Sequence, residues 1–292
     1  MPNGTYLHVG PMSAWFGGTS PTQQATWSNQ TLHYKGASKM EKATEALGWW
    51  EGGEILGGRD GLAGGTWLAS GRDGRLAFVT NVRELSVLPL AKSRGDLPVR
   101  FLESKKSPLE FAEEIVEEAH QFNGFNLILA DICSKTMVYV TNRPEEEQKF
   151  VTKVLPGIHV LANANLDTPW PKAKRLGDGF NEFLDKYGDG ELPYKEMVEK
   201  LMTNRIRDDI SLLPRIYTPE KEHCLSSIFV DADTPLGRYG TRSTSALFAT
   251  TNGEVSFYEK HLDMENEQWK ERIITYEINK EEETEPNDKT LK

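Results

Sequence analysis

The pattern of apolar and polar positions predicts short antiparallel strands joined by tight turns. The best-defined pair lies between Gly64 and Glu84, where residues 66–70 and 75–80 form two runs rich in aromatic and aliphatic side chains. Four residues, Gly71 to Gly74, separate these runs, a spacing typical of a β-hairpin. The second strand leads directly to Asn81, whose side-chain amide can both donate and accept hydrogen bonds.

More strands are predicted further along the chain. The runs 125–131 and 137–141 indicate a second hairpin, and the runs 150–155 and 158–161, which flank Pro156-Gly157, indicate a third. Toward the carboxyl end, strands are predicted at 226–231, 239–249, 254–258 and 272–278. The pair Asn252-Gly253 is typical of a tight hairpin turn between the second and third of these.

Helix signals lie between and after these strands. Ser107-Pro108-Leu109-Glu110 combines an N-cap, a proline in the first turn and a capping box, so a helix begins there and ends near His120. Other helices are predicted after Arg94, from Trp170-Pro171, and from about Pro193 to Met202. Strands on both sides of helical segments favour an α+β fold with antiparallel sheets over a doubly wound one.

The pattern divides the chain into three parts. Residues 1–42 are rich in Gly, Ser, Thr, Gln, Asn and Pro without a period of 2 or 3.6, which predicts a poorly ordered arm. Residues 43–279 carry the strand and helix signals and contain no separating linker, so we expect one domain. Residues 280–292 form a charged tail that we expect to be solvated.

Charge and composition exclude several classes of protein. The net charge is −10, from 34 basic and 44 acidic residues, and no strongly basic window occurs, which argues against binding to nucleic acid or adsorption to anionic membranes. The two cysteines do not form a disulfide framework or a metal motif, so a reducing compartment and no metal are expected. No run approaches the ~18 apolar residues of a membrane span, so we expect a cytoplasmic protein without stable membrane insertion.

A second asparagine follows a predicted buried strand in the same way as Asn81. The segment 161–170, with the sequence LANANLDTPW, carries Asn163 at the end of the third predicted hairpin. The segment therefore places further amides at the end of a sheet. Arg205 to Asp209, by contrast, is a mixed-charge turn that we interpret as a solvated face.

An ordered set of motifs between about residues 43 and 278 resembles a known family. The motifs are GGTWLA with GRLAFVTN, NGFNLILAD, LANANLDTPW, YGTRSTS and WKERIITYEI. Together they resemble the transport and Golgi organisation 2 homologue family, also called the NRDE family, and the plant-type members are the most similar. This family is related to the N-terminal-nucleophile hydrolases, so the resemblance implies an αββα sandwich. It also implies that Asn81, Asn163 and Arg242 line a ligand site or a vestigial oxyanion hole.

The chain departs from the family at its amino end. Relatives begin Met-Cys, continue into an apolar strand and then carry Asn-Arg-Asp-Glu, whereas this chain begins Met1-Pro2-Asn3 and lacks that tetrapeptide in residues 1–42. In N-terminal-nucleophile hydrolases the first residue attacks the substrate and its own α-amino group is the base. Neither Cys133 nor Cys224 has such an amine. We therefore expect no catalytic residue in this chain.

Three functions remain open from the sequence. The resemblance implies a non-catalytic binding protein in Golgi organisation and protein secretion, associated with the Golgi or mitochondria, whose partner is a lipid, acyl-CoA or haem ligand. The alternatives are a cysteine amidohydrolase acting on linear C–N bonds, and a scaffold in which Asn81 and Asn163 only end strands. No cofactor is expected, because no haem motif surrounds the available axial ligands, which are His120, His159, His223 and Cys224.

Overall fold

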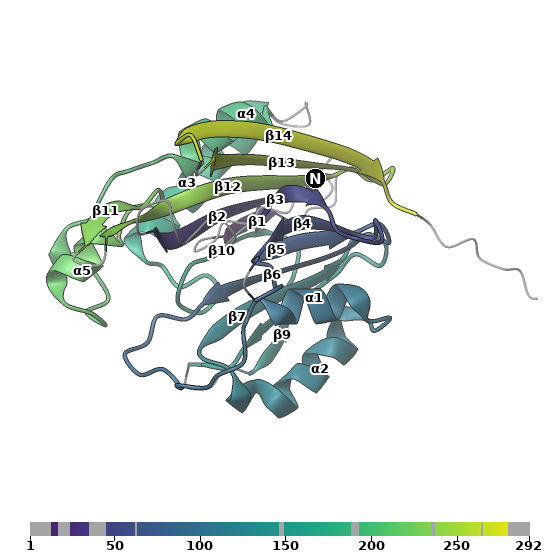
Figure 1. Cartoon of the computed structure of the whole chain (residues 1–292), viewed down its shortest axis with the longest axis horizontal. Helices are drawn as coiled ribbons and strands as arrows, with labels where there is room; N and C mark the ends of the chain where they lie inside the picture. Colours follow the sequence, from purple (N-terminus) through teal and green to yellow (C-terminus); the bar gives the residue numbers. More distant parts are fainter. Residues whose placement is uncertain are drawn as a thin grey trace, which may run out of the picture.

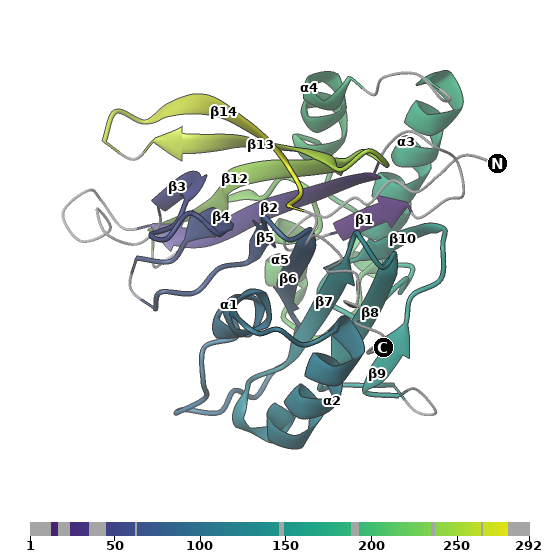
Figure 2. The same ribbon diagram turned by 90° about the vertical axis from the view of Figure 1, so that its right-hand side faces the viewer.

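The computed structural model describes residues 13–16, 24–34, 45–61, 63–145, 149–187, 193–234, 237–263 and 265–279. In this part of the chain two antiparallel sheets pack face to face and helices cover their outer faces, as Figures 1 and 2 show. The antiparallel α+β fold predicted from the sequence and the αββα sandwich implied by the family resemblance are confirmed.

The larger sheet is a meander in which each strand pairs with the next one along the chain. Its strands are β3 (Glu45–Trp49), β4 (Ile55–Arg59), β5 (Leu68–Gly71), β6 (Arg75–Asn81), β7 (Phe125–Asp131), β8 (Thr136–Thr141) and β9 (Val151–Lys153). The β5–β6 hairpin is confirmed, and Gly74 in its turn has φ +84°, a conformation that costs glycine least.

The smaller sheet contains the long carboxyl-terminal strands. It consists of β2 (Gln24–Tyr34), β11 (Asp231–Thr234), β12 (Gly237–Ala249), β13 (Glu254–Asp263) and β14 (Gln268–Glu277). The predicted Asn252-Gly253 turn joins β12 to β13, with Gly253 at φ +98°. The strand predicted at 226–231 begins only at Asp231, because the residues before it leave the sheet to reach α5.

The helices lie outside the two sheets. They are α1 (Asp96–Glu103), α2 (Pro108–Glu118), α3 (Pro171–Tyr187), α4 (Tyr194–Met197) and α5 (Pro219–Cys224), with short turns η1 (Ala119–Gln121), η2 (Val198–Met202) and η3 (Ile210–Leu212). The capping box of α2 is present, with Ser107 bound to Glu110 in both directions. The helix predicted from about Pro193 to Met202 is α4 followed by one π-helical turn.

Strand alternation divides the core into two layers. Leu76 and Phe78 of β6 join the core between the sheets, whereas Ala77 and Val79 join the core beneath α1 and α2. On the far side, the Tyr194 ring of α4 packs on Phe248 of β12 and Tyr258 of β13. Both sheets are therefore covered on their outer faces.

The third predicted hairpin is wrong. Its second strand, β10 (Ile158–Leu161), does not pair with β9 but with β1 (Ser13–Phe16). The reason is the Pro156-Gly157 turn, which gives the chain a sharp change of direction but does not specify which strand edge the next segment joins. β10 is therefore not a strand of the larger sheet, but the residue that follows it, Ala162, accepts a hydrogen bond from Thr80 of β6.

The amino-terminal segment also differs in part from the predicted arm. β1 lies within it, and β2 pairs with β12 from Gln24↔Ala249 to Tyr34↔Arg238. Thr, Trp and Tyr are frequent in strands, and β12 offers unpaired backbone groups along this edge. The remaining residues of 1–42 and the predicted tail 280–292 lie outside the described residues.

Candidate functional site

The β6 strand delivers Asn81 to one end of the larger sheet. Residues 75–80 of this strand are buried, and Asn81 is the first exposed position. It pairs with Phe125 in the register with β7. The apolar residues therefore anchor the strand, and the Asn81 side chain lies where the sheet meets solvent.

Asn163 lies directly beside Asn81. Its side-chain Nδ2 donates to the backbone carbonyl of Asn81 at 2.8 Å, and its own carbonyl accepts from the backbone N–H of Arg83 at 2.8 Å. Two residues that are 82 positions apart in the sequence are thus joined at the end of β6. The structure brings these two predicted site residues together.

A buried polar network holds the turn that carries Asn163. Thr80 Oγ1 donates to the carbonyl of Ala162 at 3.0 Å, and Asn126 Nδ2 donates to the carbonyl of Ala164 at 2.8 Å. The Tyr139 hydroxyl donates to Asn126 Oδ1 at 2.7 Å and lies 3.1 Å from Asn165 Oδ1. Burial raises the pKa of Tyr139 to about 12, so its hydroxyl remains a donor.

A buried ion pair lies next to the two asparagines. Arg83, two residues after Asn81, contacts Glu222 of α5 at 2.6 Å, and both side chains are almost completely buried. The guanidinium also lies over the Trp170 ring, 4.8 Å from its centroid. Burial lowers the pKa of Arg83, and the Glu222 carboxylate opposes this shift in part. The pair connects the end of β6 to α5 without leaving an uncompensated charge.

Lys172 adds a buried amine to the same region. Its Nζ donates to the carbonyl of Leu225 at 3.1 Å, and its side chain is 3% exposed. Burial, followed by repulsion from the charge of Arg83, lowers the pKa of Lys172 well below its ordinary value. Attraction by Asp208 and Glu222 reduces the shift but does not cancel it.

Arg242 comes from the other sheet. It lies on β12, is buried, and occupies the bulge between Thr241 and Ser243 where the register with β2 shifts. Tyr239 lies at the beginning of the same strand. Burial raises the pKa of Tyr239, and the nearby positive charge of Arg83 opposes this shift. The start of β12 therefore faces the Arg83 end of the site. Arg242 stays a predicted site residue.

The histidines and cysteines weighed as haem ligands lie elsewhere or have other partners. His159 is bonded to Asp167 and to the carbonyl of Leu155, and His223 Nδ1 lies 3.1 Å from the carbonyl of Asp208. Cys133 contacts Asp73, a residue of the turn that precedes β6. It therefore lies at the opposite end of β6 from Asn81. Within the described ranges, no group of three or more His, Cys, Asp or Glu residues could hold a metal ion.

Sequence reasoning missed Arg83, Glu222 and Lys172 as parts of this region. Arg83 stands in the segment Asn81-Val82-Arg83-Glu84, directly after a predicted strand, so its position beside Asn81 was available as a signal. Glu222 and Lys172 have no such signal. Both become buried only when the segment between α4 and β11, which contains α5, packs against the rest of the domain.

The family model for transport and Golgi organisation 2 matches residues 39–264. The chain belongs to this family. The match covers every strand of the two sheets except β2 and β14, and it includes Asn81, Asn163 and Arg242. The family resemblance found in the motifs is confirmed.

Curated relatives carry the same family name. The chain is 32% identical over 241 residues to the transport and Golgi organization 2 homolog of Mus musculus, covering 79% of this chain and 84% of that one. It is 30% identical over 241 residues to the Homo sapiens homolog, with the same coverage of both chains. The relation therefore extends over most of the domain.

Solved structures of a hydrolase and of an acid amidase align with this chain over most of its length. A variant of the conjugated bile acid hydrolase from Clostridium perfringens has a TM-score of 0.43 at 10% identity, over 94% of this chain and 97% of that one. A Caenorhabditis elegans orthologue of N-acylethanolamine-hydrolyzing acid amidase has a TM-score of 0.38 at 13% identity, over 84% and 91% of the two chains. These values describe a likeness in fold alone.

Proposed function

We propose that this family member binds a hydrophobic ligand with a carbonyl or carboxylate group, namely a lipid, an acyl-CoA or haem, and does so without turnover. The observation that carries the proposal is the pairing of Asn81 with Asn163. The Asn163 amide is held by the Asn81 backbone, so the Asn81 side chain is left at the surface as a donor and acceptor. A ligand carbonyl is its natural complement.

The surroundings support binding more than covalent chemistry. Arg83, whose backbone N–H bonds to Asn163, is neutralised by Glu222, and the turn that carries Asn163 is held by a buried network, so these polar groups keep one arrangement. The thiol of Cys133 lies at the other end of β6, about 20 Å away by strand length. This distance is too long for attack on a ligand bound at Asn81.

The biological role belongs to the same proposal. We propose that ligand handling by this site serves Golgi organisation and protein secretion, with the protein located in the cytoplasm and associated with the Golgi or mitochondria. The structure offers one related fact: in the part of the chain that it describes, no helix is long and apolar enough to cross a membrane.

A titration tests the site directly. Palmitoyl-CoA and haemin are titrated separately into the wild type, into Asn81→Ala and into Asn181→Ala, and binding is followed by thermal shift and, for haemin, by absorbance. Asn181 is the matched control, because its amide only bonds to the Gly177 carbonyl on the exposed side of α3. We expect saturable binding of at least one ligand and a loss of about tenfold in Asn81→Ala alone, as for one hydrogen bond.

Two outcomes would overturn the proposal. If neither ligand gives a saturable response with the wild type, the amides only end strands and the protein acts as a scaffold. If the protein instead releases free fatty acid from an activated ester or amide with a burst that thiol alkylation abolishes, it is a hydrolase.

A further inference from the structure

The connection from β6 to α1 exposes an unusual number of aliphatic side chains. Leu85, Val87, Leu88 and Leu90 are 78%, 67%, 45% and 98% exposed within six residues. In Figure 1 this connection loops out beyond the end of the larger sheet, on the side of α5. We name residues 85–90 the apolar loop. Apolar side chains gathered on one projecting segment mark an interaction surface.

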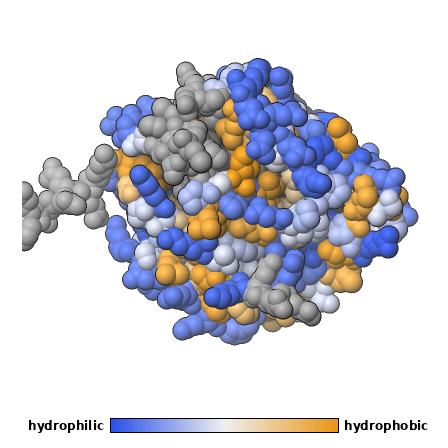
Figure 3. Space-filling view, turned by 180° about the vertical axis from the view of Figure 1, so that it is seen from behind, coloured by the Kyte–Doolittle hydropathy of each residue, from blue (hydrophilic) through white to orange (hydrophobic). Residues whose placement is uncertain are grey.

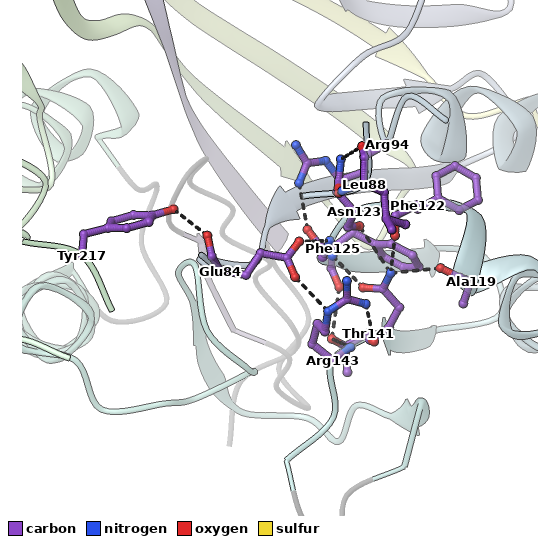
Figure 4. Close-up of polar contacts among 12 residues, drawn as sticks. Glu84, Leu88, Arg94, Ala119, Phe122, Asn123, Phe125, Thr141, Arg143 and Tyr217 are labelled. Atoms are coloured by element: carbon purple, nitrogen blue, oxygen red, sulfur yellow. Dashed lines mark hydrogen bonds and ion pairs between the residues drawn. The ribbon is translucent and has the colours of Figure 1, made fainter. Parts of the chain in front are cut away.

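The protein holds the apolar loop in this outward position. At its start, Glu84 accepts from the Gly124 N–H at 2.6 Å and pairs with Arg143 at 2.9 Å, and its carbonyl accepts from the Tyr217 hydroxyl at 3.2 Å. Figure 4 shows these contacts together with the network that follows on the 119–124 segment. The residue directly before the loop is therefore fixed to the rest of the fold.

The middle of the loop and the segment that follows it are held as well. The Leu88 N–H donates to Asn123 Oδ1 at 2.6 Å, and Arg94 Nη1 donates to the carbonyl of Gly124 at 2.9 Å (Figure 4). Asn142 Nδ2 in turn bonds to the carbonyls of Ala119 and Phe122, which fixes the segment that receives these contacts. With its backbone held, the loop does not fold its leucines back onto the domain.

We propose that the apolar loop inserts into the surface of a zwitterionic lipid bilayer and docks the protein there reversibly. The residues from Leu85 to Ala91 carry no charge. The two cations that follow the loop already have partners within the protein. Lys92 pairs with Glu118 at 2.9 Å, and Arg94 donates to the carbonyl of Gly124. The loop thus complements uncharged hydrocarbon rather than an anionic headgroup layer.

Some backbone groups in and after the loop already have partners or lack an N–H. A backbone N–H without a partner is costly in a bilayer. Pro89 has no N–H, the Leu88 N–H is bonded to Asn123, and the Ala91 N–H donates to the Leu88 carbonyl at 3.4 Å. The outermost turn can therefore leave water while these backbone groups stay satisfied.

A second copy of the chain is a poorer partner. A groove of about 710 Å³ lies along α3, but charged residues line much of it, including Lys174, Arg175, Asp178 and Glu182. Such a groove would bury charge against the leucines.

Apolar residues are also spread over the side of the molecule that bears α5, seen at the right in Figure 3. Exposed Ile206, Ile210 and Leu212 belong to the segment before α5.

Docking would place the candidate site close to the bilayer. Only Val82, Arg83 and Glu84 separate Asn81 from the loop. A ligand that partitions into the membrane would then reach the amides without crossing water. Docking itself does not depend on the ligand, so the two proposals fail separately.

Vesicle binding tests the loop. The wild type, the double variant Leu85→Ser/Leu90→Ser and the control Leu155→Ser are sedimented with phosphatidylcholine vesicles, without added ligand. Leu155 is 70% exposed and follows β9 at the opposite end of the larger sheet. We expect the wild type and the control to bind with the same affinity, independently of salt. The double variant should bind at least about tenfold more weakly. All three should unfold at the same urea concentration.

Several results would overturn the inference. They are a wild type that does not bind these vesicles, an equal loss in the Leu155 variant, and binding that requires phosphatidylserine and disappears with salt. Sedimentation equilibrium without lipid covers the remaining case. If the wild type forms a dimer and the double variant does not, the loop is an interface between copies of the chain.

Discussion

The side-chain amide of Asn163 donates to the backbone carbonyl of Asn81, not to its side chain. The two asparagine side chains therefore have different structural roles. Asn163 fastens the turn after β10 to the end of β6, whereas the Asn81 side chain projects from the strand without taking part in this bond. Substitutions at the two positions should separate stability from ligand binding.

Asn163→Ala should lower the free energy of unfolding by about 1 kcal/mol, because one hydrogen bond is lost and the Asn81 carbonyl loses its partner. Asn81→Ala should change it by less than about 0.5 kcal/mol, since the residue is exposed and its backbone carbonyl remains. Urea unfolding of both variants checks this. Equal destabilisation would show that the Asn81 side chain is structural.

Tyr139→Phe should lower the free energy of unfolding by about 1–3 kcal/mol, because the change leaves buried amide oxygens of Asn126 and Asn165 without their donor. Tyr187→Phe is the matched control, since the Tyr187 hydroxyl bonds to Glu196 near the surface. Its cost should stay below about 1 kcal/mol. If the two variants were equally stable, the network would not hold the Asn163 turn.

Glu222→Gln should destabilise the protein by about 3 kcal/mol or more, because it leaves the buried Arg83 guanidinium without a counter-charge. The double variant Arg83→Met/Glu222→Leu should recover part of this loss, since no charge then stays buried. A double-mutant cycle measured by urea unfolding gives the coupling between the two side chains. Additive effects would contradict the buried ion pair.

Lys172 predicts a specific pH dependence. Its pKa is lowered in the folded protein from an ordinary value of 10.5, so between these two values the unfolded chain binds more protons than the folded one. The contribution to the free energy of unfolding therefore rises with pH across this interval and falls as the pH drops through the folded pKa.

Lys172→Met removes this titration. We expect the variant to be at least as stable as the wild type at pH 7 and to lose its advantage near pH 10, when both are measured by urea unfolding. A constant difference between the two proteins over this range would show that the Lys172 amine stays charged in the folded state.

The local elements of the fold could be predicted because local physics specifies them. The β5–β6 hairpin follows from two runs of aromatic and aliphatic residues and the turn that contains Gly74, and α2 follows from the Ser107 capping box. The path of β10 could not be predicted in this way. Which edge it joins depends on β1, a strand from a segment whose sequence has no regular apolar period.

The candidate site was predictable for the same reason and to the same extent. Asn81 and Asn163 each follow a strand, and the family resemblance pointed to their common location. The buried partners did not follow from the sequence, because Glu222 and Lys172 look like ordinary surface residues of polar helices until α5 packs against Arg83. Burial of a charge is a property of the assembled chain.

The most direct test of the ligand site observes the two amides themselves. The side-chain N–H₂ signals of Asn81, Asn163 and Asn181 are assigned by substitution in ¹⁵N-labelled protein, and palmitoyl-CoA and haemin are then titrated in separate experiments. The account predicts a saturable shift or broadening of the Asn81 signal with at least one of the two ligands, a smaller change at Asn163 and none at Asn181. An Asn81 signal that stays unchanged while either ligand binds elsewhere on the protein would contradict it.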